Sequence, residues 1–339
     1  MESIFLNKGD FIKCVESDGS TAYQLHNESG EGTITIYEVF PGVTLSYNDF
    51  HIRYYDSAFI PRRDLFCIDH CREGRLEYPA AQDAYSYVEA GDLKLDRRLT
   101  HTGHFEMPLE HYHGAMISFE METACKALPL EIKDFPVDLR EVQRKFCSGI
   151  YPMVLHGDSS VEHIFGELYA VPEKIKRPYF KIKILELLLY LEALELGENT
   201  ADGMAAKPYF YKAQVEKVKA VRKFLVSHLD ENYTQEELSV RFDIPLTTMK
   251  RCFKSVFGAS IGSYLTEYRM NQAAVMLKTK REMSVADISG CVGYDSPSKF
   301  AIVFRRVMGM SPSEYRRRSI YSQMAGFNGK TSIYGDTGV

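Results

Sequence analysis

The chain has 339 residues, of which 45% are hydrophobic and 26% charged, a composition that excludes a disordered or fibrous protein. This length accommodates two or three domains, each with its own core. The formal net charge of −5 is unevenly distributed, because residues 207–320 contain 20 Lys and Arg against 11 Asp and Glu, and the rest of the chain contains 21 against 35. We therefore expect only the basic C-terminal part to approach a polyanion, although a solvated charged face would have the same composition.

Neither a membrane span nor a secretory signal is apparent, since no uncharged apolar run is long enough and the start MESIFLNKGDF lacks a basic-then-apolar order. We expect a cytoplasmic protein without a membrane partner. The seven cysteines are an odd number scattered over a large chain. We interpret them as reduced thiols, most of them buried.

Short strand-like segments occupy the N-terminal part, separated by Gly, Pro, Asp and Asn. They lie at residues 33–39, 65–71, 75–78, 85–92 and 115–121. Many short strands at such spacing favour a sandwich or a barrel.

Three helical patterns follow, at residues 138–147, 160–169 and 178–196. The last, PYFKIKILELLLYLEALEL, has Pro178 in its first turn and is apolar on most of its circumference. Such a helix must be covered on more than one side, either by the core of its own domain or by a second subunit.

The segment GENTADGMAAKP, residues 197–208, has the composition of a linker. We accordingly predict a β-rich barrel in residues 1–135, a helical packing or dimerisation segment in 136–200, a linker in 201–210, an all-helical domain in 211–320 and a mobile tail in 321–339.

A small unit occurs twice near the C-terminal end. FKSVFGASIGSY, residues 253–264, is echoed 51 residues later by FRRVMGMSPSEY, residues 304–315. Each copy lies on an amphipathic helical stripe that ends at Gly258 or Gly309, the residue type that adopts the left-handed conformation at a helix end.

A shorter helix precedes each repeated helix. The spacing of a capping box occurs twice, in Thr234 with Glu237 and in Ser284 with Asp287. In a capping box, a hydroxyl caps the start of a helix and an acidic side chain three residues later bonds back to the capping residue. Helix, tight turn and helix, twice over, predict two helix-turn-helix motifs.

Residues from about 218 to 317 resemble the DNA-binding domain of the AraC/XylS family of transcription regulators. The similarity rests on EELSVRFDIPLTTMKRCFKSVFGASIGSYLTEYRMNQAAVML and on SVADISGCVGYDSPSKFAIVFRRVMGMSPSEYRR. It implies an all-α domain of two helix-turn-helices joined by a helix at 262–279, and a non-enzymatic regulator that binds an operator in double-stranded DNA. The joining helix suits this role, because successive major grooves lie ~34 Å apart.

The resemblance also implies partners and an N-terminal sensor. Family members often carry a cupin-like β-barrel that binds a small effector or dimerises, so we expect such a barrel here, a homodimer, RNA polymerase as a partner and no cofactor. HCREGR, residues 70–75, and PLEHYHG, residues 108–114, are weakly similar to the siderophore-responsive members of the family.

The residues expected to contact DNA lie on the faces opposite the apolar stripes. Lys250 and Arg251 can donate to guanine, Thr247 suits a thymine methyl or a phosphate, and Lys254 suits a phosphate. The second helix presents Ser298, Lys299, Ala301, Ile302, Arg305 and Arg306.

Two positions depart from the family pattern. Ile302 stands where a long polar or basic residue is usual, so the second helix is expected to add apolar and backbone contacts more than direct base readout. Pro245 replaces the usual capping Ser or Thr of the first recognition helix, which removes a side-chain cap but fixes the backbone angle.

The N-terminal part offers weaker candidates for metal or thiol chemistry. Among His101, His104, His111 and His113, only His111 and His113 point the same way on a strand and could ligate a metal, but the acid expected shortly afterwards is missing. Cys67, Asp69 and Cys71 share one strand face. They could form a thiol sensor or a metal site, but simple burial of two small side chains is favoured because no basic residue lies beside both cysteines.

Two alternatives to an effector-controlled regulator remain at this point. One is a metal-dependent cupin-type enzyme with an accessory DNA-binding module, which needs a complete ligand set. The other is a constitutive regulator whose N-terminal part only dimerises, which would have an apolar-filled barrel without a cavity.

Overall fold

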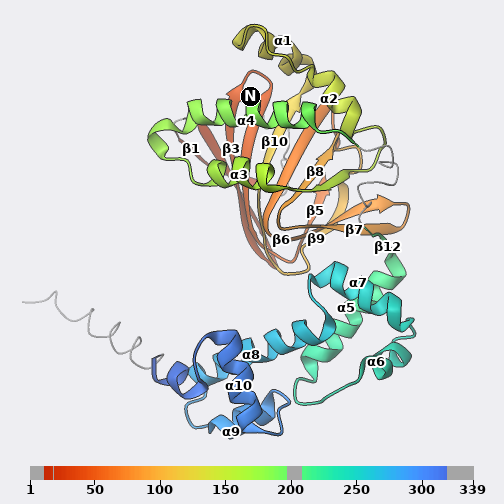
Figure 1. Cartoon of the computed structure of the whole chain (residues 1–339), viewed down its shortest axis with the longest axis vertical. Coiled ribbons are helices and arrows are strands. Elements are labelled where there is room, and N and C mark those ends of the chain that lie inside the picture. Colours follow the sequence, from red (N-terminus) through yellow and green to blue (C-terminus); the bar gives the residue numbers. More distant parts are fainter. Residues whose placement is uncertain (1–10, 18, 197–207, 319–339) are drawn as a thin grey trace, which may run out of the picture. The chain divides into compact units, whose positions relative to one another are not determined.

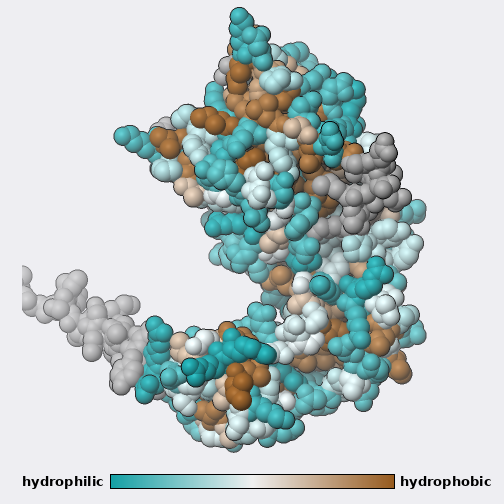
Figure 2. All heavy atoms as spheres, viewed as in Figure 1, coloured by the Kyte–Doolittle hydropathy of each residue, from teal (hydrophilic) through white to brown (hydrophobic). Residues whose placement is uncertain are grey.

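The computed structural model describes residues 11–17, 19–196 and 208–318. The chain divides into two compact units at Lys212 and Ala213, with residues 255–258 grouped with the first (Figure 1). We call them the N-terminal domain and the helical domain. On the visible face of each domain, hydrophilic residues cover much of the surface, and apolar patches interrupt them (Figure 2). No helix of the described residues combines the length and apolarity needed to cross a bilayer.

The N-terminal domain is built around antiparallel strands. They are β1 (Phe11–Ser17), β2 (Ser20–Asn27), β3 (Gly30–Phe40), β4 (Val43–His51), β5 (Tyr54–Ala58), β6 (Leu65–Ala81), β7 (Ala84–Glu89), β8 (Asp92–Asp96), β9 (Thr102–Glu106), β10 (Tyr112–Glu120), β11 (Met153–His156) and β12 (Phe210–Tyr211).

The strands form one large sheet and a separate pair. Hydrogen-bonded neighbours run β1-β2-β3-β4-β10-β6-β7-β12, β8 pairs with β6 and β11, and β5 pairs with β9. The sheet is curved (Figure 1), but within the described residues no pairing returns to β1, so backbone hydrogen bonds do not close a barrel. The predicted class, a β domain with helices followed by an all-α domain, is confirmed, and the likeness to cupins stays a prediction.

Two predicted strands prove to be one. Segments 65–71 and 75–78 both belong to β6, which pairs with β8 and β10 up to Gly74 and with β7 from Arg75 onward. Gly74 has φ of 91°, and a Cβ there would lie 2.3 Å from the carbonyl oxygen of His111. A glycine is required because the chain changes partners at a close backbone approach.

Helices cover one face of the large sheet. They are α1 (Met121–Glu131), α2 (Leu139–Phe146), α3 (Ser159–Tyr169) and α4 (Lys176–Ala193), with a 3₁₀ turn at Glu173–Ile175. The predicted helices 138–147, 160–169 and 178–196 correspond to α2, α3 and α4, whereas α1 was not predicted. Figure 1 shows α3 and α4 lying across the sheet.

The largest apolar core lies between that sheet face and the helices. It contains Leu45, Ile68, Ile117 and Phe119 from strands, and Phe165, Phe180 and Leu187 from helices. α4 contributes one face to this core, while Ile182 and Leu189 stay 60% and 44% exposed. Core packing therefore accounts for only part of the helix's apolar surface.

The helical domain begins with α5 (Lys212–Ser227) and continues with α6 (Gln235–Arg241), α7 (Leu246–Phe257), α8 (Ile261–Thr279), α9 (Val285–Cys291) and α10 (Pro297–Met308). Most of the predicted linker, and all of the predicted tail at 321–339, lie outside the described residues. Phe210, at the end of the predicted linker, pairs with Tyr85 of β7.

Candidate functional site

The first helix-turn-helix consists of α6 and α7. Thr234 and Glu237 form the predicted capping box, in which the Glu237 N–H donates to Thr234 Oγ1 at 3.2 Å and the Thr234 N–H to Glu237 Oε2 at 2.8 Å. Two otherwise unpaired N–H groups are thus satisfied, which fixes where α6 starts. The turn that follows contains Asp243 with φ of 47°, and its carboxylate accepts from Lys217 Nζ at 2.9 Å.

α7 has two chemically distinct faces. The predicted apolar stripe is buried in full: Met249, Cys252, Phe253, Val256 and Phe257. The four predicted DNA contacts all have exposed side chains: Thr247, Lys250, Arg251 and Lys254. No described residue forms a salt bridge with any of the three cations, so their charge is available to an external anion.

The second helix-turn-helix repeats this construction in α9 and α10. Ser284 and Asp287 form a second capping box, with distances of 2.9 Å and 3.0 Å. Ser296 caps α10 ahead of Pro297, and Gly309 ends the helix with φ of 77°. Each of these features was predicted, and together they determine the position of α10.

The polar face of α10 differs from that of α7. Of its six candidate residues, five are exposed and Ala301 is half-buried; the exposed ones are Ser298, Lys299, Ile302, Arg305 and Arg306. Ile302 is 71% exposed. This exposed isoleucine lies between cations and gives the second face an apolar centre.

Each helix-turn-helix has a serine at the same position that closes its turn, and the sequence did not reveal this pair. Ser239 Oγ donates to the carbonyl of Ile244 at 2.7 Å, and Ser289 Oγ to that of Tyr294 at 3.4 Å. Equivalent residues of the two motifs are 50 positions apart as far as these turns, and 51 positions apart in the helices that follow. The turn of the second motif is therefore one residue longer. Aligning the two halves at a shift of 50 residues as well as 51 would have revealed that Ser239 matches Ser289.

Arg269 of α8 links the two halves. Its guanidinium is buried and donates to Asn232 Oδ1 at 2.9 Å and to the carbonyl of Glu231 at 2.6 Å, just before α6. Asn232 Nδ2 donates in turn to the carbonyl of Gly293, in the second turn, at 3.2 Å. With 19 residues, α8 extends over ~28 Å and can act as a rigid spacer.

These features define a DNA-binding domain with two helix-turn-helices. A family model described as "Helix-turn-helix domain" matches residues 238–318. The helical domain is therefore a helix-turn-helix domain of the AraC type, as the sequence analysis predicted.

Curated relatives share this part of the chain. The HTH-type transcriptional regulator YdiP of Escherichia coli is 28% identical over 162 residues, covering 48% of this chain and 52% of that protein. The regulator ExsA of Pseudomonas aeruginosa is 32% identical over 100 residues, covering 30% and 36%. The chain thus spans about half or less of the length of these relatives. Among solved structures, the DNA-binding domain of AdpA in complex with a target DNA is 30% identical, covers 32% of this chain and 96% of that chain, and has a TM-score of 0.31.

A cavity of about 80 Å³ lies in the N-terminal domain, between the large sheet and the β5–β9 pair. Apolar side chains such as Ile34, Phe50 and Met107 line it, together with Lys94 and Arg98. This volume is well below the ~300–1,000 Å³ of ordinary small-molecule sites, so only a small molecule fits without rearrangement.

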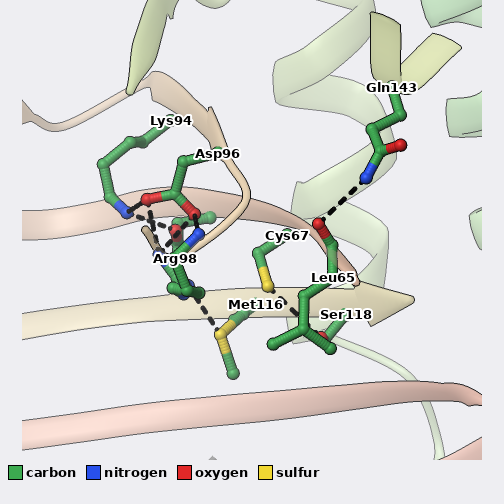
Figure 3. Close-up of polar contacts among 9 residues, drawn as sticks. Leu65, Cys67, Lys94, Asp96, Arg98, Met116, Ser118 and Gln143 are labelled. Atoms are coloured by element: carbon green, nitrogen blue, oxygen red, sulfur yellow. Dashed lines mark hydrogen bonds and ion pairs between the residues drawn. The ribbon is translucent and has the colours of Figure 1, made fainter. Parts of the chain in front are cut away.

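Asp69, Lys94 and Arg98 line the cavity and form a buried cluster of four charges with Asp96 (Figure 3 labels Lys94, Asp96 and Arg98). Arg98 contacts Asp69 at 2.7 Å and Asp96 at 3.1 Å, and Lys94 contacts the same carboxylates at 2.8 Å and 2.9 Å. Burial alone would raise the pKa of Asp69, but Arg98 and Lys94 outweigh burial and hold that pKa below its usual value. The pKa of Asp96 is lowered for the same reason. The cluster therefore stays ionised and carries no net charge.

The predicted arrangement of Cys67, Asp69 and Cys71 on one strand face is confirmed, since all three are buried on the face opposite Ile68 and His70. Burial raises the pKa of the Cys67 thiol to about 11. This favours a structural thiol over a redox sensor, because the reactive form is the thiolate. The six cysteines whose side chains the structure describes are all free, and Cys291 is exposed.

The four candidate histidines do not converge on one point. His101 borders the cavity, where burial and the cations Arg98 and Lys94 lower its pKa to about 3. His104 pairs with Asp56 at 2.8 Å. His111 and His113 lie near each other, with ring centroids 5.8 Å apart, but only His113 joins a group of ligand atoms on neighbouring strands.

Proposed function

We propose that the protein is a sequence-specific DNA-binding regulator of transcription that acts in the cytoplasm. The observation that carries this proposal is the pair of exposed basic faces on α7 and α10. Each face belongs to the second helix of a helix-turn-helix whose first helix starts with a capping box. One continuous helix, α8, joins the two motifs. Lys250 and Arg251 would contact base edges, and Lys254, Arg305 and Arg306 would contact phosphates.

Selection of DNA from a random pool by the full-length protein tests this proposal. We expect enrichment of a sequence with two conserved blocks about one helical turn apart, because each recognition helix reads one major groove. A gel-shift titration at fixed salt should then show at least ~10³-fold tighter binding to this sequence than to random DNA. Recovery of unrelated sequences after repeated rounds would contradict the proposal.

We further propose that the N-terminal domain controls DNA binding through a small effector held in the cavity. The cavity favours this over a domain that only dimerises. Its walls are largely apolar, and the charged residues that line it, Asp56, Asp69, Lys94 and Arg98, sum to zero, so it suits a small, neutral, mainly apolar molecule with one or two polar groups. A thermal-shift screen of small metabolites, followed by gel shifts with each hit, would identify it.

Self-association through α4 is part of the same proposal. Ile182 and Leu189 are seven residues apart on one exposed face of α4, a spacing at which two helices can pack side by side. A homodimer would cover this face, and RNA polymerase is the expected further partner. Sedimentation of the wild type and of Ile182→Glu would show whether the dimer exists and whether it uses this surface.

A metal-dependent cupin-type enzyme is the less favoured alternative. Such an enzyme would need several metal ligands in the cavity, but Asp69 there is paired with Lys94 and Arg98. Among the described residues, His101 is the one histidine that lines the cavity. The matched relatives carry regulator names.

A further inference from the structure

Three side chains with metal-binding atoms meet on the helix-covered face of the sheet, away from the cavity. Asp49 and His51 lie on β4, and His113 lies opposite Asp49 on β10. Asp49 Oδ1 is 3.1 Å from His51 Nε2 and 3.2 Å from His113 Nε2. All three ligand atoms lie within 4.8 Å of one another.

These distances suit a shared metal ion. Ligand atoms ~2.0–2.1 Å from a tetrahedral metal lie ~3.3 Å from each other, close to the two carboxylate–imidazole separations given above. The Nε2 atom of His113 is also shielded from solvent and makes no hydrogen bond with any described residue, despite its proximity to Asp49. A buried nitrogen without a hydrogen bond is costly unless it has another partner.

Residues around the three ligands add to the case. Glu73 pairs with His113 on the other neighbouring strand, and its Oε2 lies 3.8 Å from His113 Nδ1. At 3.8 Å this carboxylate is too far away for a hydrogen bond, but its negative charge favours a cation at this place. Glu73 Oε1 also lies 3.7 Å from the Nε2 atom of His111, which is close to the three residues but is not one of them.

Solvent can reach the site. Asp49 and His51 are exposed, and a surface hollow beside them is lined by Asp49, His113, Arg72 and Tyr169. An ion held by three side chains here would retain positions for water or an exogenous ligand, and it could exchange with solution.

We propose that Asp49, His51 and His113 bind a divalent transition-metal ion of the Zn²⁺, Co²⁺ or Ni²⁺ type. Two imidazoles and one carboxylate favour these ions over Mg²⁺ and Ca²⁺, which prefer all-oxygen ligand sets, and the absence of thiolate among these ligands disfavours Cu⁺. The bound ion joins β4 to β10. The proposal is independent of DNA binding.

Titration of tag-free, chelator-treated full-length protein with CoCl₂ and ZnCl₂ tests the site. We expect one ion per chain, with visible absorption from bound Co²⁺ that ZnCl₂ displaces and MgCl₂ does not. His51→Gln and His113→Ala each remove an imidazole, and Asp49→Asn removes the negative charge of the carboxylate, so each should weaken binding by at least about 10-fold. Both His51 and Asp49 are exposed, so their variants should fold normally, which circular dichroism would verify.

His104→Ala is the matched control. His104 also lies between two carboxylates, 2.8 Å from Asp56 and 3.5 Å from Glu106, but it has no second imidazole in a ligand group. The His104→Ala substitution should leave the Co²⁺ affinity unchanged. Absence of Co²⁺ and Zn²⁺ binding by the wild type, or equal loss in the His104 variant, would overturn the proposal and leave these residues as an ion-pair network.

Discussion

Arg98 Nη2 lies 2.7 Å from Asp69 Oδ1, although the two residues are 29 positions apart, and both side chains are buried. Arg98 also contacts Asp96, so one guanidinium neutralises two carboxylates beside the cavity. We predict that Arg98→Ala destabilises the N-terminal domain by about 3–5 kcal/mol, because it leaves buried carboxylates with less compensation. Urea unfolding followed by circular dichroism would measure this.

The neighbouring Arg97 provides the control. It pairs with Asp64 at 2.9 Å, but both side chains are more than a third exposed. Arg97→Ala should cost less than about 1 kcal/mol, as is usual for a surface pair. Equal losses for the two variants would mean that burial does not distinguish these ion pairs.

His70 makes the stability of the N-terminal domain depend on pH. Its ring stacks on Phe165 with centroids 4.2 Å apart, the residue is 6% exposed, and burial lowers its pKa to about 4. The unfolded chain, with a His pKa near 6.5, therefore binds more protons between pH 6.5 and 4. The contribution of His70 is fully present above pH 6.5 and is lost as the pH falls through this window.

Lowering the pH from 7 to 5 should cost about 2 kcal/mol through His70 alone. His70→Phe removes the titrating group and keeps an aromatic ring against Phe165. Whatever its stability at pH 7, the free energy of unfolding of this variant should fall less between pH 7 and pH 5 than that of the wild type. Parallel pH dependences in urea unfolding would argue against the role of His70.

Arg251 and Lys254 are expected to differ in what they recognise. Arg251→Ala should cost about 1–3 kcal/mol on the selected operator and relax the base preference at one position, since it removes a contact to a base edge. Fluorescence anisotropy with single-base operator variants would show which position loses its preference. An unchanged preference would exclude Arg251 from base readout.

Lys254→Ala should instead weaken binding to all DNA sequences about equally. It should also reduce the slope of log K against log salt by about 1, because one phosphate contact and its released counterion are lost. Glu236, exposed in the first turn of α6, offers a charge-changing control on the same motif. If Glu236→Ala alters the slope as much as Lys254→Ala, the effect reflects overall charge only.

Ile302 should contribute to DNA binding without changing its salt dependence. Its side chain is 71% exposed on the face of α10 that carries Lys299 and Arg305. Contact with a thymine methyl would bury part of this apolar surface, so Ile302→Ala should cost about 1 kcal/mol. Salt titrations of both proteins should give parallel lines, whereas a changed slope would contradict an apolar contact.

The helical domain was largely predictable because its determinants are local. A capping box involves residues three positions apart, and an amphipathic stripe repeats every three or four residues. Thr234, Ser284 and Gly309 consequently behave in the structure as the sequence indicated. The link through Arg269 and Asn232 was missed, because it joins residues 37 positions apart.

The N-terminal domain was less predictable. β8, with the sequence DLKLD, was not predicted because its three charged residues suggest a loop, yet all five residues are buried. Lys94 and Asp96 are tolerated inside because Asp69 of the distant strand β6 pairs with Lys94, and Arg98, two residues after β8, pairs with Asp96. Similarly, strand pairing between distant segments places Asp49 of β4 opposite His113 of β10, which the sequence around His113 did not indicate.

The sequence by itself thus determined the duplicated DNA-binding module and the faces of its recognition helices, because hydrogen bonds and helical periodicity between near neighbours specify them. Only the tertiary structure decided which charges are buried, where the cavity lies and which histidine meets a carboxylate. Those features depend on strand pairing between distant segments, and no local pattern in a sequence records that pairing.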